Sequence, residues 1–140
     1  MRVLLDTCVI SELVVPRPDP KVVQWVDSLD ESTVFLSAIT IGEIQRGVAR
    51  LPDSARKQRL ADWLNGDLLV RFQDRILPLG VAELLTWGTL VARLEAQGRP
   101  LPAMDSLIAA IALTHNLYLA TRNESDFAGT GVPILNPWSS

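Results

Sequence analysis

The chain has 140 residues and a formal net charge of −3, with 48% hydrophobic and 21% charged residues. This length allows one domain with a substantial core, and the composition excludes an intrinsically disordered protein. The negative charge argues against a broad basic surface for nucleic acid, so any such binding must depend on a local patch or on metal ions at an acidic site.

The chain has one cysteine, Cys8, which excludes an internal disulfide framework and a cysteine-based zinc site and is typical of a reducing compartment. No apolar run reaches the roughly 18 residues that cross a bilayer. Asp6 interrupts the first apolar stretch too early for a signal peptide. We therefore expect a single domain over residues 1–140, located in the cytoplasm and with no membrane contact.

The predicted elements alternate between short buried strands and amphipathic helices. Strands are expected over residues 3–5, 33–37, 76–79, 117–121 and 133–135. Helices are expected over residues 7–13, 20–29, 40–50, 53–68, 81–97 and 103–115. This alternation predicts an α/β fold in which helices flank a central, mostly parallel sheet of five strands.

Acidic residues follow several of these strands or begin neighbouring helices. Asp6 follows the first strand, and Glu43 lies in the first turn of the helix after the second strand. Asp105 begins the helix that leads into the fourth strand, which Asn123 and Asp126 follow. Ligands bind at the edge of a parallel sheet where the carboxyl ends of the strands meet, so we expect these side chains to converge there.

A cluster of carboxylates of this kind would need a cation, because the like charges repel one another. Hard divalent ions such as Mg²⁺ or Mn²⁺ prefer oxygen ligands and complete their shells with water and substrate phosphate. Two such ions can hold the attacking and leaving oxygens of a phosphodiester displacement. The pattern therefore predicts metal-assisted phosphodiester chemistry, with these metal-binding and catalytic candidates: Asp6, Glu43, Asp105 and Asp126.

Each acid also has a purely structural interpretation. Asp6 could cap the helix that follows it, and Thr40 with Glu43 has the S/T-x-x-E pattern of a capping box. Asp105 gains from the dipole at a helix start, and Asp126 could cap a turn. These interpretations do not explain why all the acids would share one edge of the sheet, and both remain open at this point.

Two arginines are candidates for contacts with RNA phosphates. Arg46 shares the helical face of Glu43, and Arg122 directly follows the fourth strand. Solvation, or pairing with acids of a partner, is the alternative for both. His115 is interpreted as a helix cap or packing residue and Cys8 as a small packed side chain.

Four stretches of the sequence resemble motifs of the PIN-domain ribonucleases, specifically the VapC-like toxins of bacterial toxin–antitoxin pairs with their FitB-like branch. They occur in the order of the family and span the chain from end to end. In chain order they are LDTCVISE (residues 5–12), SAITIGEI (37–44), GRPLPAMDSLIAA (98–110) and TRNESDF (121–127).

The resemblance implies a PIN-like fold and a Mg²⁺- or Mn²⁺-dependent endoribonuclease that cleaves RNA with a metal-activated water. Asp6, Glu43 and Asp105 match the acidic positions of the family. The fourth acid often stands two residues after the threonine, where this chain has Asn123, so Asn123 and Asp126 are alternatives for that position.

The resemblance further implies a toxin that forms homodimers and is inhibited by a small antitoxin, whose C-terminal segment packs over the site. The polar neighbours of the acids, Thr7, Thr121 and Asn123, are expected to orient them. Cys8 is a departure, since asparagine is commoner at that position, and it would loosen the surroundings of Asp6.

Other classes fit less well. A receiver domain needs an acidic pair after the first strand, and a haloacid-dehalogenase-type phosphatase needs a second aspartate two residues after Asp6, where Cys8 stands. A dinucleotide-binding domain needs a G-x-G-x-x-G turn, which the chain lacks. The remaining alternative is a catalytically weak PIN-like module that binds RNA or protein.

Overall fold

A five-stranded sheet forms the centre of the computed structural model, which describes residues 1–139. The strand order is β3-β2-β1-β4-β5, and every neighbouring pair is parallel. The strands are β1 (Val3–Leu5), β2 (Val34–Ser37), β3 (Ile76–Leu77), β4 (Tyr118–Ala120) and β5 (Ile134–Leu135). The predicted α/β fold with a five-stranded sheet is therefore confirmed, and the sheet is parallel throughout.

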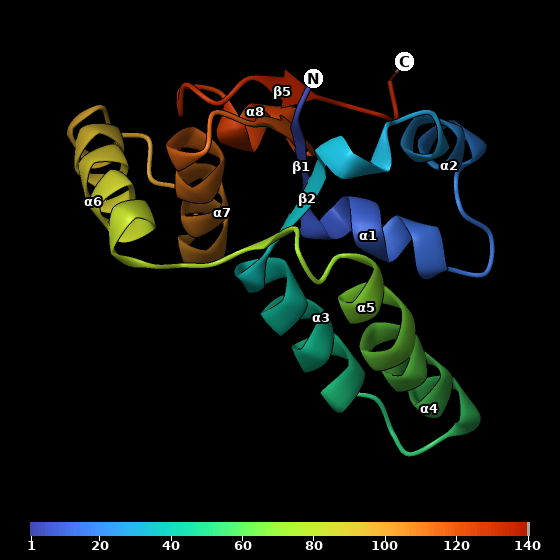
Figure 1. The fold of residues 1–140 in the computed structure, drawn as a ribbon. Helices are drawn as coiled ribbons and strands as arrows, with labels where there is room; N and C mark the ends of the chain where they lie inside the picture. The colour runs from blue at the N-terminus through green and yellow to red at the C-terminus, as the bar shows by residue number, and fades with distance from the viewer. Residues whose placement is uncertain (140) are drawn as a thin grey trace.

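Helices cover both faces of this sheet (Figure 1). One side carries α6 (Val81–Ala96) and α7 (Ala103–Thr114), and the other carries α1 (Thr7–Val14) and α2 (Pro20–Asp27). The connecting elements are η1 (Glu31–Thr33), α3 (Ala38–Ala49), α4 (Ala55–Asp62), η2 (Trp63–Leu68), α5 (Leu69–Arg71) and α8 (Glu124–Phe127). Figure 1 shows α3 and α4 extending from the sheet as an arm in which the two helices contact each other.

The central strand β1 divides the hydrophobic core into two parts. Val3 and Leu5 pack on the side of α1 and α2, whereas Leu4 packs on the side of α6 and α7. All three side chains are buried. This alternation follows from the two-residue period of a strand, and burial on both faces explains why β1 is apolar without a break.

The start of α3 corrects one prediction. Ser37 is the N-cap, and its hydroxyl accepts from the backbone N–H of Thr40 at 3.0 Å. The helix therefore begins at Ala38, and Glu43 lies in its second turn. The interpretation of Thr40 and Glu43 as a capping box is wrong, because the serine at the end of β2 already caps the helix.

The helix expected over residues 53–68 is also interrupted. It begins as α4 at Ala55, continues as the π-helical segment η2 and ends as α5 at Arg71. In η2 the side-chain amide of Asn65 donates to the carbonyl of Ala61 at 2.9 Å, the acceptor that a regular α-helix offers to the backbone N–H of residue 65. A local feature of this kind does not alter the apolar spacing from which the helix was predicted.

The other predicted boundaries differ from the observed ones by at most two residues. β3 ends at Leu77, before Pro78, which has no N–H to donate to a sheet. α6 is followed by Gly98, whose φ of 67° suits glycine at the end of a helix. His115 is the C-cap of α7, as expected, and its Nε2 lies 3.4 Å from Glu83 Oε2. Within residues 1–139, no helix is both long and apolar enough to cross a membrane.

Candidate active site

Asp6 lies at the carboxyl end of the central strand and is only 4% exposed. Its backbone N–H donates to the carbonyl of Ala120 at 2.9 Å, which ties it to β4. Its Oδ1 accepts from the backbone N–H of Thr7 at 2.8 Å, and its Oδ2 accepts from Thr121 Oγ1 at 2.7 Å. Asp6 is thus the cap of α1 as well as a member of the acidic site, so its two interpretations are compatible.

A chain of hydroxyl groups orients Glu43. Thr7 Oγ1 donates to Glu43 Oε1 at 2.6 Å, and because this hydroxyl has one proton it must accept from Thr40 Oγ1, which lies 2.9 Å away. Thr40 in turn accepts from Ser37 Oγ at 3.2 Å. The direction of the chain from Ser37 to Glu43 is therefore fixed. Ser37 and Thr40 are members of the site that sequence reasoning missed, although both lie in a quoted motif.

Asp105, in the first turn of α7, shows that the predicted acids share one site. Partial burial raises the pKa of its carboxyl group to about 6, and the negative charges of Asp6, Glu43 and Asp126 add to the rise. The structure thus brings together four carboxyl groups that are far apart in sequence. A bound cation would relieve the mutual repulsion of these groups.

Asn123 and Asp126, the two candidates for the fourth acidic position, have different surroundings in the structure. The backbone N–H of Asn123 donates to Thr121 Oγ1 at 3.1 Å, while its side chain makes no capping bond and the residue is exposed. Asp126 lies on the short helix α8 and is exposed. Its negative charge contributes to the raised pKa of Asp105. The N-cap of α8 is Asn123, so Asp126 is not the cap of this turn.

Cys8 is partly buried beside Asp6. Its Sγ lies 3.6 Å from Asp6 Oδ2 and 3.7 Å from Thr121 Oγ1. Burial, and then the charge of Asp6, raise the pKa of the thiol, which keeps it protonated and unreactive as a nucleophile. Its interpretation as a packed side chain is consistent with its contacts to the core.

The two predicted RNA-binding arginines lie in different surroundings. Arg46 is exposed on α3, and its side chain makes no hydrogen bond or ion pair within residues 1–139. The guanidinium carbon of Arg122 lies 5.4 Å from the centre of the Trp138 ring, in a cation–π contact. RNA binding by either residue stays a prediction.

The donors at the site fit a hard divalent cation, because carboxylate and hydroxyl oxygens dominate it. Within the described residues, no three acidic, histidine or cysteine side chains form a ready-made chelating group. An open site of this kind suits Mg²⁺, which is commonly held by one or two carboxylates and otherwise by water and substrate phosphate.

Comparison with known proteins places this geometry in a family. The PIN domain matches residues 3–132. The chain belongs to the PIN-domain family. This PIN domain is 36% identical over 136 residues to VapC ribonuclease Y4jK of Sinorhizobium fredii, a match that covers 97% of each chain. It is 39% identical over 136 residues to Toxin FitB of Neisseria gonorrhoeae, with 97% of this chain and 98% of FitB covered.

Solved structures agree with the sequence relatives. The crystal structure of FitAcB from Neisseria gonorrhoeae contains a chain with a TM-score of 0.94 and 38% identity to this PIN domain, with 99% of each chain covered. A chain in the structure of FitAB bound to a DNA fragment also has a TM-score of 0.94, with 37% identity and 99% of this chain and 96% of that chain covered. The likeness extends over the whole fold, including every element that carries an acid.

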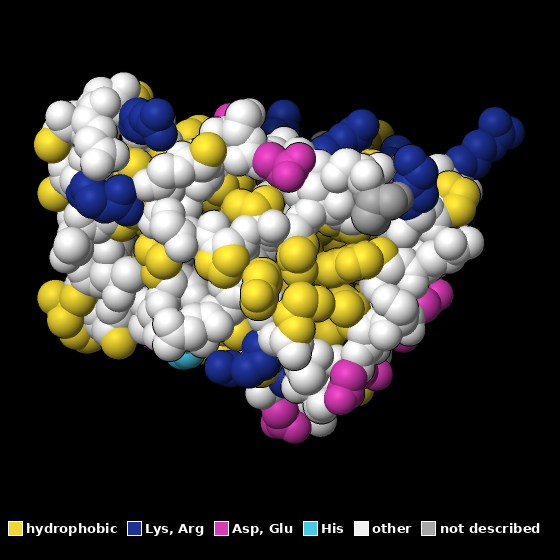
Figure 2. Space-filling view, turned by 90° about the horizontal axis from the view of Figure 1, so that it is seen from above, with side chains coloured by type: hydrophobic (Ala, Val, Ile, Leu, Met, Phe, Trp, Pro, Cys, Tyr) yellow, Lys and Arg dark blue, Asp and Glu magenta, His cyan; other side chains and the backbone are white. Residues whose placement is uncertain are grey.

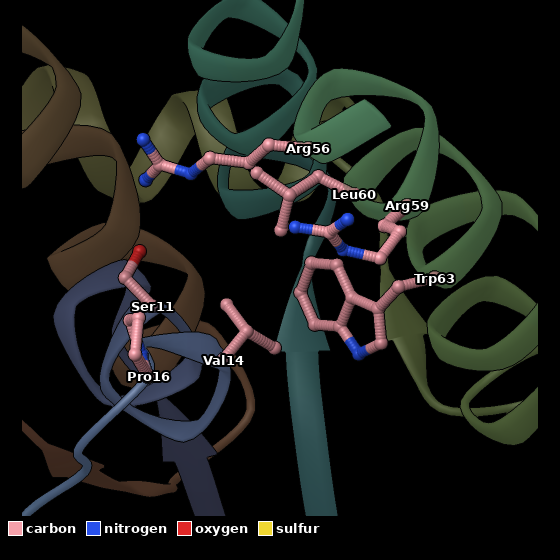
Figure 3. Close-up of a pocket in the computed structure, with 7 residues that line it drawn as sticks. All are labelled: Ser11, Val14, Pro16, Arg56, Arg59, Leu60 and Trp63. Carbon is pink, nitrogen blue, oxygen red and sulfur yellow. The ribbon is translucent and has the colours of Figure 1, made fainter. Parts of the chain in front are cut away.

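An apolar groove lies beside the acids of the PIN domain, between α1 and the α4–η2 segment (Figure 3). Its cavity of about 600 Å³ is lined by Ser11, Val14, Pro16, Arg56, Arg59, Leu60 and Trp63. A smaller pocket of about 230 Å³ shares five of these residues and reaches Thr7 and Glu43. The groove therefore leads into the acidic site. Sequence reasoning missed it, because the spacing of Leu60 and Trp63 predicts only a core-facing stripe.

Proposed function

We propose that this protein is a metal-dependent endoribonuclease and acts as the toxin of a toxin–antitoxin pair. The observation that carries the proposal is the charge coupling of Asp105 to Asp6, Glu43 and Asp126 at the carboxyl edge of the sheet. The relatives named as a VapC ribonuclease and as toxin FitB support it. RNA is the proposed substrate.

The four acids would coordinate Mg²⁺ or Mn²⁺, with Asp6 and Asp105 at the centre of the site and Glu43 and Asp126 at its rim. When bound, such an ion offsets the carboxylate charge and makes a water molecule more acidic. Thr7 and Thr121 hold both oxygens of Asp6 in place. Glu43 is oriented through Oε1, which accepts from Thr7 Oγ1, and its Oε2 would take part in holding the ion.

The proposal is tested by incubating the purified protein with a structured RNA in the presence and absence of Mg²⁺ or Mn²⁺. We expect metal-dependent cuts that vanish in Asp6→Ala and Asp105→Ala. Asp74→Ala is the matched control, because Asp74 is exposed and has no hydrogen bond within residues 1–139. RNA binding without cuts under every metal condition would instead favour a binding module.

The antitoxin is proposed to dock in the apolar groove of Figure 3. Leu60 and Trp63 line it from the α4–η2 side and Val14 from α1, which suits an apolar segment. Arg56 and Arg59 lie at the same groove and would attract acidic residues of that segment. Because the groove leads to Glu43, an occupant would also close one side of the acidic site.

A homodimer is the proposed assembly, and the outer face of α6 supports it. Val81, Leu84 and Leu85 are 76%, 43% and 69% exposed, and Leu85 borders a shallow apolar groove with Leu113 of α7. α6 lies at the left of Figure 1, and Figure 2 shows hydrophobic side chains along this same left edge. Light scattering on the purified protein tests the assembly: we expect a dimer that Leu85→Lys converts to a monomer.

A further inference from the structure

A second, polar pocket adjoins the acidic site at Asp126. It has a volume of about 300 Å³ and lies between the loop that joins α6 to α7 and the segment that begins with α8. Asp126 lines it, and so does Pro102, three residues before Asp105. It shares no residue with the apolar groove or with the smaller pocket at Glu43. Two separate pockets of different chemistry therefore touch the acidic site, one at Glu43 and the other at Asp126.

Arg99 supplies the positive charge of this polar pocket. Its guanidinium makes no hydrogen bond or ion pair within residues 1–139, although Asp126 lines the same pocket. The guanidinium packs against Gly129, where an added Cβ would lie 2.7 Å from Arg99 Nη1. Gly129 also has a φ of 95°, a backbone conformation that favours glycine, and a side chain there would displace the end of Arg99.

The wall against which Arg99 packs is fixed by other side chains. Arg93 of α6 donates to the carbonyls of Gly129 and Thr130 at 2.8 and 3.0 Å. Thr130 is 2% exposed, and its hydroxyl donates to the carbonyl of Phe127 at 2.7 Å. This wall of the pocket is therefore held in place by hydrogen bonds, which lowers the entropy cost of binding against it.

The chemistry of the pocket selects an anion with an apolar portion. A guanidinium without a carboxylate partner binds phosphate well. Pro100, Leu101 and Pro102 form an apolar wall beside it, suited to a sugar or the face of a base. Its volume is at the low end of the range of about 300–1,000 Å³ for small-ligand pockets, which suits one nucleotide and not a duplex.

We propose that this pocket binds the nucleotide next to the scissile phosphate of a single-stranded RNA, and that Arg99 holds that nucleotide's phosphate. The proposal rests on the ribonuclease function proposed above. RNA is favoured over an acidic segment of a protein partner, because Asp126 of the acidic site lines this pocket and no residue of the apolar groove does. Arg99 is thus a substrate-binding residue that positions the chain for cleavage.

The test is steady-state cleavage of a short single-stranded oligoribonucleotide, with the salt dependence of its binding. We expect Arg99→Gln to raise KM about tenfold with kcat nearly unchanged. The slope of log affinity against log salt should fall by about 0.7, the value of one phosphate contact on a single strand. Arg99→Lys should restore part of the affinity, and Arg17→Gln, another exposed arginine without a bond within residues 1–139, should match the parent.

The possible outcomes are distinguishable. An unchanged KM and salt slope in Arg99→Gln, with an unchanged melting temperature, would overturn the proposal while leaving the ribonuclease function intact. A variant that loses only its inhibition by an antitoxin would show that Arg99 binds a protein carboxylate, which also overturns it. If the parent binds the oligoribonucleotide without cleaving it, the proposed function fails, and the salt slope still decides the role of Arg99.

Discussion

Among single side chains, Asp105 is the one whose chemistry depends most on its neighbours. Its pKa of about 6 reflects partial burial and the charges of three other acids. An unfolded chain would release this proton at a lower pH, so the native state becomes less stable, relative to the unfolded chain, as the pH rises from about 4 to about 6. The site is therefore electrostatically strained at neutral pH in the absence of metal.

Removing the charge of Asp105 should relieve this strain. We expect Asp105→Asn, without metal at about pH 7, to be more stable than the parent by on the order of 1 kcal/mol, a value reduced for partial exposure. At about pH 4 the gain should disappear, because the parent is then protonated too. Thermal unfolding with a chelator checks this, with Asp74→Asn as control. An Asp105→Asn variant that melts below the parent at neutral pH would contradict the crowding of the acids.

The hydroxyl group of Thr7 links Glu43 to Thr40, and its contribution to RNA cleavage can be tested by substitution. Thr7→Val keeps the shape of the side chain and removes its donor to Glu43 Oε1. A hydrogen bond to a charged group is worth about 1.5–3 kcal/mol, so we expect RNA cleavage to fall at least about tenfold. Thr33→Val, which removes a hydroxyl bonded only to the backbone carbonyl of Asp30, is the control. Equal cleavage by both variants would show that the hydroxyl chain does not orient Glu43.

Among the elements, α4 and η2 form the apolar groove together with α1, so they are central to the proposed binding of the antitoxin. The π-helical segment η2 begins at Trp63, and its Leu64 and Leu68 are buried. The segment therefore keeps its core contacts and still places Trp63 at the groove. Single-turn irregularities of this kind often occur at functional positions.

A substitution at Val14 tests whether the antitoxin binds in the apolar groove. It lines the groove from α1 and is not one of the fully buried residues. We expect Val14→Asp to weaken binding of the antitoxin at least about tenfold, because a carboxylate would be buried against apolar atoms. Cleavage of RNA by the free protein should be unchanged. Val70→Asp on α5, at a position that is 57% exposed, is the control, and calorimetry with the antitoxin measures the difference.

For the molecule as a whole, one central strand connects both cores to the acidic site. Val3, Leu4 and Leu5 are at most 1% exposed, and the next residue is Asp6. The position of this carboxyl group is therefore fixed by packing on both faces of the sheet. A cation bound there would be linked to the stability of the entire fold.

The linkage predicts a response to metal that depends on pH. We expect Mg²⁺ or Mn²⁺ to raise the melting temperature of the parent at about pH 7, because the ion binds the native state only. The rise should shrink as the pH falls below about 6, where a proton on Asp105 competes with the ion. Thermal unfolding over a pH series checks this. A rise of equal size in Asp6→Ala would place the ion elsewhere on the protein.

The strands and the gathering of the acids could be predicted from the sequence, since both follow from local patterns. An apolar run ending in an acid predicts a buried strand with a carboxylate at its end, and parallel pairing then brings such ends together. The start of α3 could not be predicted, because Ser37 and Thr40 are both residue types that cap helices. The hydrogen bond from Thr7 to Glu43 could not be predicted either, because it joins residues 36 positions apart. The contact of Arg99 with Gly129 is likewise long-range, and no local signal marks it.

The two pockets beside the acids have no residue in common, and this has an evolutionary consequence. If the apolar groove binds the antitoxin and the polar pocket binds RNA, as proposed, a substitution in one need not disturb the other, and the two kinds of binding can diverge independently among paralogous copies of such a gene. A cell that carries several copies could then keep each toxin matched to its own antidote while their targets diversify.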